Sequence, residues 1–442
     1  MELKQLLGSS FDCECGRHHV VSIEDLIYHR DAFESIPALS RKITAGQRCL
    51  VIADTRTYLI AGMEIAGILK ASGFKAECFV VPDSDGESPA ADEKTRDLLL
   101  AKTCPADLYL AVGSGVINDL VKWLAHLRQK PYIAAATAAS MNGYGSANVA
   151  ATVAGLKTLI QATPPRAVIA RPDIIINAPP ELSGAGLGDV LAKPVSGADW
   201  KLNQYLFKDY YCQFSVDLLK NLEPVYLDNP QKIRDREEQG FEALFMALFY
   251  SSVAMTVTGT SAPASGAEHL ISHTLDILAG RDRFSHDLHG RQVGVSSILM
   301  AALYERVMAI DKPVFRKPLQ CVDQTFWGEL TPVVESEYQK KLPRMGQAVE
   351  ILTRPDTWNA LRSHVAAQLI PAWKLKQCLE NAGAAHRYED IRFNQMPLAR
   401  DFFVSVVCHA NQMRSRFTIL DLASMLGILD EDTETLIDTW LT

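Results

Sequence analysis

The first 180 residues alternate between short apolar runs and stretches with helical periodicity. The apolar runs are predicted strands: Cys49–Ala53, Glu77–Val81, Leu108–Val112, Tyr132–Ala135, Ala167–Ala170 and Ile174–Ile176. The stretches between them, such as Tyr58–Ser72 and Val116–Arg128, are predicted helices. Continuous apolar strands separated by helices are typical of a parallel sheet covered on both faces. We therefore predict a doubly wound α/β nucleotide-binding domain over residues 1–180.

After Pro179 and Pro180 the pattern changes to helical periods with few β-branched runs. The clearest predicted helices are Ile233–Val257, Glu268–Ala279, Val293–Val307 and Leu361–Asn381. We therefore predict an all-α C-terminal domain over residues 181–442. The run from Ala243 to Gly259 is apolar enough to resemble a membrane span, but Glu242 lies at its edge and Ser and Thr lie within it. We predict a buried core helix there.

Charge and cysteine content exclude several classes of protein. The chain has 44 basic and 52 acidic residues, a net charge of −8, and no basic run. This balance argues against nucleic acid or an anionic membrane surface as the main partner. Nine cysteines spread thinly over 442 residues indicate a reduced protein. Because the first residues also lack the pattern of a signal peptide, we expect a cytoplasmic protein, and a homodimer is the default expectation.

A glycine-rich turn follows the predicted strand Leu108–Val112. A strand that runs into such a turn and then into a helix lets backbone N–H groups approach a phosphate. The candidate cofactor-binding residues in this turn are Gly113, Ser114, Gly115, Val116, Ile117 and Asp119. The spacing lacks the third glycine of the dinucleotide fingerprint, so an ordinary tight turn is the alternative.

Two further strand ends carry polar side chains. Thr137, Ser140 and Ser146 lie in a hydroxyl-rich loop after the predicted strand Tyr132–Ala135, and they are candidates for binding a cofactor. Asp54 ends the first predicted strand, where an acidic residue often binds a ribose hydroxyl. It could equally be the N-cap of the next helix.

Histidines cluster near the middle of the predicted helical domain. His269 and His273 are four residues apart and therefore share one helix face, and Gly280 is expected to end their helix. A polar loop with His286, our expected non-ligand, then leads to His289. Imidazoles in this arrangement are typical of metal sites, and Asp189 is the best candidate for an added carboxylate. Such a set suits zinc, and also iron or nickel; chance clustering of surface histidines is the alternative.

The N-terminal segment holds Cys13, Cys15, His18 and His19. Their spacing is compatible with a small zinc site, although a surface turn without metal is the favoured interpretation.

Five motifs occur in an order that resembles one enzyme family: Gly113–Asp119, Thr137–Ser146, Ala185–Lys193, Ser265–His273 and Leu288–Gly294. The chain is similar to the sn-glycerol-1-phosphate dehydrogenase family, a branch of the iron-containing alcohol dehydrogenase and glycerol dehydrogenase superfamily with a dehydroquinate synthase-like fold. The N-terminal Cys15–His19 and C-terminal Arg414–Leu426 segments also look like bacterial members.

The resemblance implies roles for individual residues. NAD or NADP would be held by Gly113–Ile117, Thr137–Ser140 and Ser146. One divalent metal would be bound by Asp189, His269 and His289. Asp189 and His273 would be catalytic, and both would lie near the substrate with Asn142. Lys193 stands where iron-type members of the superfamily carry a further histidine ligand, so three protein ligands are expected.

The implied reaction interconverts dihydroxyacetone phosphate and sn-glycerol 1-phosphate by hydride transfer. Two positions depart from the family pattern: Asn142 replaces an expected Asp, and Ala262 replaces an expected Arg. The loss of an Arg removes a plausible phosphate clamp. Three alternatives therefore stay open: a polyol or aldehyde dehydrogenase for an unphosphorylated substrate, a dehydroquinate synthase-like lyase, and a catalytically silent member of the fold.

Overall fold

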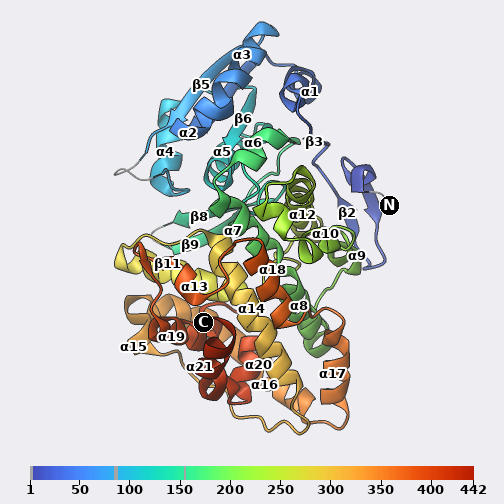
Figure 1. Ribbon diagram of the computed structural model, residues 1–442, viewed down its shortest axis with the longest axis vertical. Helices are drawn as coiled ribbons and strands as arrows, with labels where there is room; N and C mark the ends of the chain where they lie inside the picture. Colours follow the sequence, from blue (N-terminus) through green and yellow to red (C-terminus); the bar gives the residue numbers. More distant parts are fainter. Residues whose placement is uncertain (1–2, 84–87, 154–155) are drawn as a thin grey trace. The chain divides into compact units, whose positions relative to one another are not determined.

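The computed structural model describes residues 3–83, 88–153 and 156–442, which form two compact units (Figure 1). The first unit comprises Met1–Gly186 and Asp217–Thr260, and the second comprises Leu187–Val216 and Ser261–Thr442. The chain therefore enters each unit twice.

A six-stranded parallel sheet forms the centre of the first unit, with strand order β3-β10-β7-β6-β4-β5. In chain order its strands are β3 (Asp25–Tyr28), β4 (Arg48–Asp54), β5 (Lys75–Val81), β6 (Leu108–Gly113), β7 (Tyr132–Ala136) and β10 (Ala167–Ala170). The strand order reverses between β4 and β6. Ligands of open α/β sheets bind at such a point, outside the carboxyl ends of the strands.

Apolar side chains from alternate strand positions, such as Val51 and Leu110, form one core with Phe33, Ile65 and Leu69 from the covering helices. The elements of the first unit outside the sheet are η1 (Leu3–Leu6), β1 (Ser10–Asp12), β2 (His18–Val20), η2 (Ala32–Ser35), α1 (Ile36–Ile43), α2 (Thr55–Thr57), η3 (Tyr58–Gly62), α3 (Met63–Ala71), α4 (Glu93–Lys102), α5 (Gly115–Leu127), β8 (Asn148–Val153), β9 (Leu156–Gln161), α6 (Pro172–Asn177), α10 (Glu223–Asp228), α11 (Gln231–Arg234) and α12 (Glu238–Thr258).

Five of the predicted strands are confirmed as β4, β5, β6, β7 and β10. The prediction of a strand at Ile174–Ile176 is wrong, because Pro172 begins helix α6 there. A short apolar run cannot by itself distinguish a strand from a buried helix. The sequence analysis missed the half-buried edge strand Asp25–Tyr28.

Helix α12 accounts for the difference between the predicted boundary near residue 180 and the observed units. The Phe245 ring stacks on Tyr28 at 5.3 Å between centroids and contacts Tyr144 at 5.9 Å, so this helix packs in the first unit. Helical periodicity does not reveal which core a helix joins. α12 is long and apolar enough to cross a membrane, but 83% of its most apolar window is buried, which agrees with a core helix.

The second unit is mostly helical. Its elements are α8 (Lys193–Phe207), α13 (Ala267–Asp282), α14 (His289–Met308), α15 (Gln324–Trp327), η4 (Gly328–Leu330), α16 (Thr331–Leu352), α17 (Thr357–Ala366), α18 (Ala372–Asn381), η5 (Tyr388–Asp390), β11 (Arg392–Phe393), β12 (Met396–Pro397), α19 (Arg400–His409), η6 (Ala410–Met413), α20 (Ile419–Met425) and α21 (Ile428–Trp440). Helices α7 (Pro180–Val190) and α9 (Gln213–Asp217) lie where the chain changes unit.

The all-α prediction holds for this unit apart from the short ribbon β11–β12. The predicted helix Leu361–Asn381 is two helices, because Pro371 precedes α18. Gly280 does not end α13, which continues to Asp282 and stops where Arg283 adopts a left-handed conformation.

Candidate active site

The glycine turn lies at the carboxyl end of β6. A Cβ atom on Gly113 would lie 2.6 Å from Cβ of Ile117, so only glycine fits where the strand meets α5. Ser114 precedes the helix, and its hydroxyl is hydrogen-bonded to that of Ser140. The backbone N–H of Thr137 donates to the Gly113 carbonyl at 3.2 Å. The structure therefore brings together the two predicted cofactor loops, beside the point where the strand order reverses.

Lys122 holds the loop that follows β7 in place, and the sequence does not predict this role. Its side chain is completely buried, and its Nζ donates to the carbonyls of Gly143 at 2.9 Å and Asn148 at 2.8 Å. It also donates to the Ser146 hydroxyl at 3.0 Å and to Asp119 at 3.2 Å. Asp119 and Ser146 therefore belong to the scaffold that holds the loop. In the sequence, the pairing of Lys122 with Asp119 is indicated only by their spacing of one helical turn.

We expect the substitution Lys122→Met to destabilise the loop. It would leave two partly buried carbonyls without their donor, which corresponds to a loss of about 2 kcal/mol in the free energy of unfolding. Urea unfolding measures this loss, and fluorescence titration with NAD(P)H should show weaker cofactor binding. The exposed Lys130 offers the control Lys130→Met; equal effects of the two substitutions would contradict the assigned role.

Asp54 caps helix α2. Its carboxylate accepts hydrogen bonds from the N–H groups of Arg56 and Thr57, both at 2.8 Å. This confirms the N-cap alternative, and a contact with ribose stays a prediction.

The structure also places the other predicted site residues of the first unit. Asn142 follows β7, and its amide donates to the Ser251 hydroxyl at 3.5 Å. Val116 is 38% exposed on the first turn of α5, whereas Ile117 is buried beneath the glycine turn.

A cluster of candidate metal ligands lies in the second unit. Potential ligand atoms of Asp189, His269 and His289 lie within 4.8 Å of one another. Nε2 of His269 is 3.7 Å from Oδ1 of Asp189, and the rings of His269 and His289 are 5.0 Å apart between centroids. Asp189 is at the end of α7, His269 is in the first turn of α13, and His289 begins α14.

Hydrogen bonds orient both imidazoles. Nδ1 of His269 is 2.8 Å from a carboxylate oxygen of Glu268, so Nε2 is left to face Asp189. Nδ1 of His289 is 2.9 Å from the Ser272 hydroxyl, which donates to Gln292 at 2.7 Å. Such outer contacts fix the tautomer of ligating histidines. Burial lowers the pKa of His269 to about 4 despite the opposing charge of Asp189, and so keeps the neutral imidazole that metals bind. The donor set fits a divalent metal.

Two glycines place Asp189 against His289. A Cβ on Gly188 would lie 2.1 Å from the Gly290 carbonyl oxygen, and one on Gly294 would lie 2.8 Å from Cα of Gly188. The backbones of helices α7 and α14 are therefore in direct contact, with no side chain between them at these glycines. The glycines are visible in the sequence, but the contact between them is a tertiary feature that spacing does not predict.

His273 lies next to the cluster, one turn after His269. Its ring stacks on His289 at 5.5 Å between centroids, and His273, Asp276 and His289 form a second, overlapping group of possible ligands. His286 belongs to neither group; it lies 3.4 Å from Asp276. Lys193 is buried at the start of α8.

Asp199 joins four elements around the cluster. Its buried carboxylate accepts from the N–H groups of Ala267 at 2.7 Å and Ile419 at 2.8 Å, and from the Tyr304 hydroxyl at 2.6 Å. These bonds link α8 to the N-termini of α13 and α20 and to α14. Burial, together with the nearby Glu268, raises the pKa of Asp199 to about 7.

We expect Asp199→Asn to lower the free energy of unfolding by about 2 kcal/mol, because one buried donor loses its acceptor. Loss of this bond should also displace the N-terminus of α13, which carries His269, and so weaken metal binding. Thermal unfolding and metal content measure the two effects. Asp209 on the same chain segment offers a control: it is half-buried and paired with Arg344, and an equal loss in Asp209→Asn would contradict the role of Asp199.

Two arginines from the segment between η6 and α20 lie close to the cluster. Arg416 donates to the Ser265 carbonyl and to the Ser261 hydroxyl, and so holds the loop before α13. Within the part of the chain that the structure describes, Arg414 makes no hydrogen bond or ion pair. Both guanidinium groups are near enough to His269 to help lower its pKa. The sequence analysis noted this segment only as part of the resemblance.

The fold and the cluster define a class: metal-dependent alcohol dehydrogenases with a nucleotide-binding sheet and a helical unit. The family profile of the iron-containing alcohol dehydrogenases matches residues 27–179. Among solved structures, glycerol dehydrogenase from Schizosaccharomyces pombe shares the fold, with a TM-score of 0.60 at 17% identity over 94% of this chain and 91% of that one. A 1,3-propanediol oxidoreductase does so with a TM-score of 0.58 at 14% identity, over 94% and 98%.

Relatives of known name are closer in sequence. The glycerol-1-phosphate dehydrogenase of Halalkalibacterium halodurans is 31% identical over 77% of this chain and 82% of its own length. That of Geobacillus thermodenitrificans is 28% identical over 84% of this chain and 89% of its own. The chain belongs to the glycerol-1-phosphate dehydrogenase family, as the five motifs predict.

Proposed function

We propose that this protein reduces dihydroxyacetone phosphate to sn-glycerol 1-phosphate with NAD(P)H, and catalyses the reverse oxidation. The observation that carries the proposal is the buried group Asp189, His269 and His289 in a member of a family whose relatives are named for this activity. NAD(P)H would bind at Gly113–Ile117 and Thr137–Ser140.

The side chains of the second unit support each part of this chemistry. A bound divalent metal, with zinc favoured, would polarise the ketone, and NAD(P)H would supply the hydride. Glu268 and Ser272 hold the two imidazoles in place through their Nδ1 atoms. His273, whose ring stacks on His289, would deliver a proton to the substrate oxygen.

The phosphate group of the substrate would be bound by cationic side chains. Because residue 262 is alanine rather than arginine, another residue must supply the positive charge. We assign this role to Arg414, a half-buried residue whose side chain makes no hydrogen bond or ion pair among the described residues, although the Glu337 carboxylate attracts its charge. Arg416 reaches back to the same loop that contains Ala262, through Ser261 and Ser265. In this proposal, a cation from the C-terminal segment would take the place of the arginine that the loop lacks at position 262.

A direct test is the oxidation of NAD(P)H by metal-reconstituted protein with dihydroxyacetone phosphate and with unphosphorylated dihydroxyacetone. We expect the phosphate to be preferred by about 10²-fold in kcat/KM, because charge-assisted hydrogen bonds to it contribute about 2–3 kcal/mol. The product should be a substrate for oxidation only as the sn-glycerol 1-phosphate enantiomer. Activity confined to dihydroxyacetone would overturn the proposal in favour of a polyol dehydrogenase, and phosphate release without net cofactor oxidation would indicate a lyase.

We further propose a cytoplasmic homodimer. The nine cysteines carry no disulfide among the described residues, which agrees with a reducing compartment. Light scattering of the purified protein gives the oligomeric state, and a monomeric mass would contradict the dimer.

A further inference from the structure

The N-terminal ribbon contains a cluster of metal-ligating side chains that the dehydrogenase reaction does not use. Strands β1 and β2 pair in antiparallel register, with Phe11 opposite His19 and Asp12 opposite His18. The turn between them is closed by two backbone hydrogen bonds, from Cys13 to Arg17 at 3.0 Å and from Gly16 to Cys13 at 2.9 Å. Gly16 has a φ of 82°, a conformation that glycine adopts readily.

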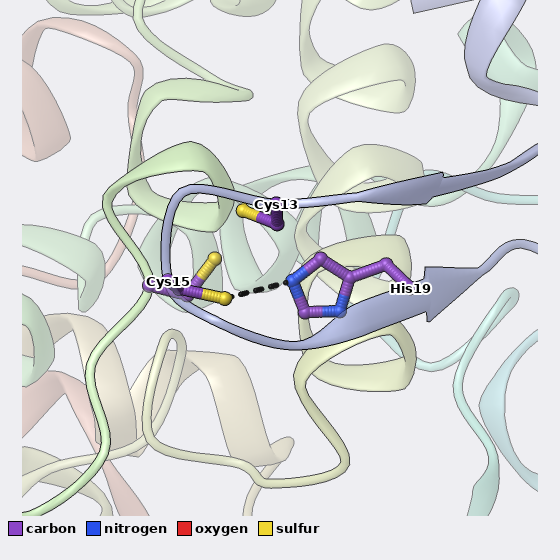
Figure 2. A group of neighbouring side chains, drawn as sticks. Cys13, Cys15 and His19 are labelled. Atoms are coloured by element: carbon purple, nitrogen blue, oxygen red, sulfur yellow. Dashed lines mark hydrogen bonds between the residues drawn. The ribbon is translucent and has the colours of Figure 1, made fainter.

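This turn brings two thiols and one imidazole together (Figure 2). Sγ of Cys15 is 3.2 Å from Nε2 of His19, and the ligand atoms of Cys13, Cys15 and His19 all lie within 4.8 Å of one another. Ligands of a tetrahedral zinc ion stand about 3.5–3.8 Å apart, given Zn–S and Zn–N bonds of about 2.3 and 2.0 Å. The Cys15–His19 separation is slightly below this range and the other separations do not exceed 4.8 Å, so an ion would fit with small side-chain adjustments.

The surroundings of His19 are those of a metal ligand. Its ring is buried, whereas His18 points to the opposite face, where it pairs with Asp12 at 2.9 Å. The backbone carbonyl of Val257, near the end of α12, accepts a hydrogen bond from the His19 imidazole. Nε2 faces Cys15, and a hydrogen bond to a backbone carbonyl is a usual outer contact of a ligating histidine.

We propose that Cys13, Cys15 and His19 bind a structural zinc ion, distinct from the metal of the reaction. Two thiolates and an imidazole form a set that selects zinc over magnesium or calcium. The fourth tetrahedral position goes to a donor outside these three side chains. The strands are three residues long, and such a ribbon is marginally stable by itself. The ion would fix it on the end of α12, where Arg17 also donates to the Thr258 carbonyl at 3.5 Å.

Substitution of cobalt for zinc tests the proposal, because only a site with sulfur ligands gives an intense thiolate-to-cobalt charge-transfer band. The reaction's candidate ligands, Asp189, His269 and His289, contain no sulfur. We expect the full chain loaded with cobalt to show this band, and Cys13→Ser and Cys15→Ser each to abolish it. The exposed Cys78 gives the matched control Cys78→Ser, which should retain it. His19→Cys should keep a metal ligand and the band, whereas His19→Ala should weaken it.

The unmodified protein gives a second readout that does not depend on the folding of variants. Iodoacetamide should label Cys13 and Cys15 slowly in the zinc-loaded protein and rapidly after chelation, as followed by mass spectrometry. Three results would overturn the proposal: no thiolate band from protein with both thiols reduced, labelling unaffected by the chelator, or a disulfide between Cys13 and Cys15 in protein isolated under reducing conditions.

Discussion

The substitution His289→Ala is expected to remove the metal of the reaction and to lower kcat/KM by about 10³-fold or more. His289 begins α14, and its ring is fixed by Ser272 on one side and stacked on His273 on the other. Metal polarisation of a carbonyl contributes several kcal/mol to transition-state stabilisation, and each 1.4 kcal/mol or so corresponds to a factor of ten in rate. Metal analysis and NAD(P)H oxidation on the same samples measure both losses.

His286 provides the matched control for this experiment. It lies three residues before His289 and carries the same ring, yet it is outside both groups of possible ligands and is 3.4 Å from Asp276. His286→Ala should therefore keep the metal and most of the activity. A His289→Ala protein that retains its metal and turns over would contradict the assignment, and so would an equal loss of metal in His286→Ala.

The sequence predicted the features that depend on local spacing. Apolar runs marked the central strands, and the glycine turn was found where β6 meets α5. The interval of four residues between His269 and His273 predicted a shared helix face, and their rings lie 5.9 Å apart between centroids. Each of these features is decided within one or two turns of chain, where residue period and conformation are directly linked.

Features decided by tertiary contacts could not be predicted in the same way. Nothing local shows that α12 packs with Tyr28 and Tyr144 rather than with the helices that follow it. The approach of Asp189 to His289 depends on the contact between Gly188 and Gly294, which are 106 positions apart in the chain. The proposed role of Arg414 depends equally on the tertiary position of the segment before α20.

The substitution Arg414→Ala is expected to abolish the preference for a phosphorylated substrate. The kcat/KM for dihydroxyacetone phosphate should fall by about 10²-fold, because a guanidinium paired with phosphate contributes about 2–3 kcal/mol. The value for unphosphorylated dihydroxyacetone should change little, since Arg414 makes no hydrogen bond that supports the described structure. Arg414→Lys should recover part of the loss, as lysine keeps the charge but not the planar fork.

Arg416 distinguishes recognition of the phosphate from support of the fold. Its bonds to Ser261 and Ser265 hold the loop before α13, which carries His269. Arg416→Ala should therefore reduce activity toward both substrates together and lower the thermal stability. Parallel steady-state kinetics on the two variants, with both substrates, separate these effects. If Arg414→Ala reduced both activities to the same extent, Arg414 would be a structural residue, and the phosphate would have to be bound by other donors.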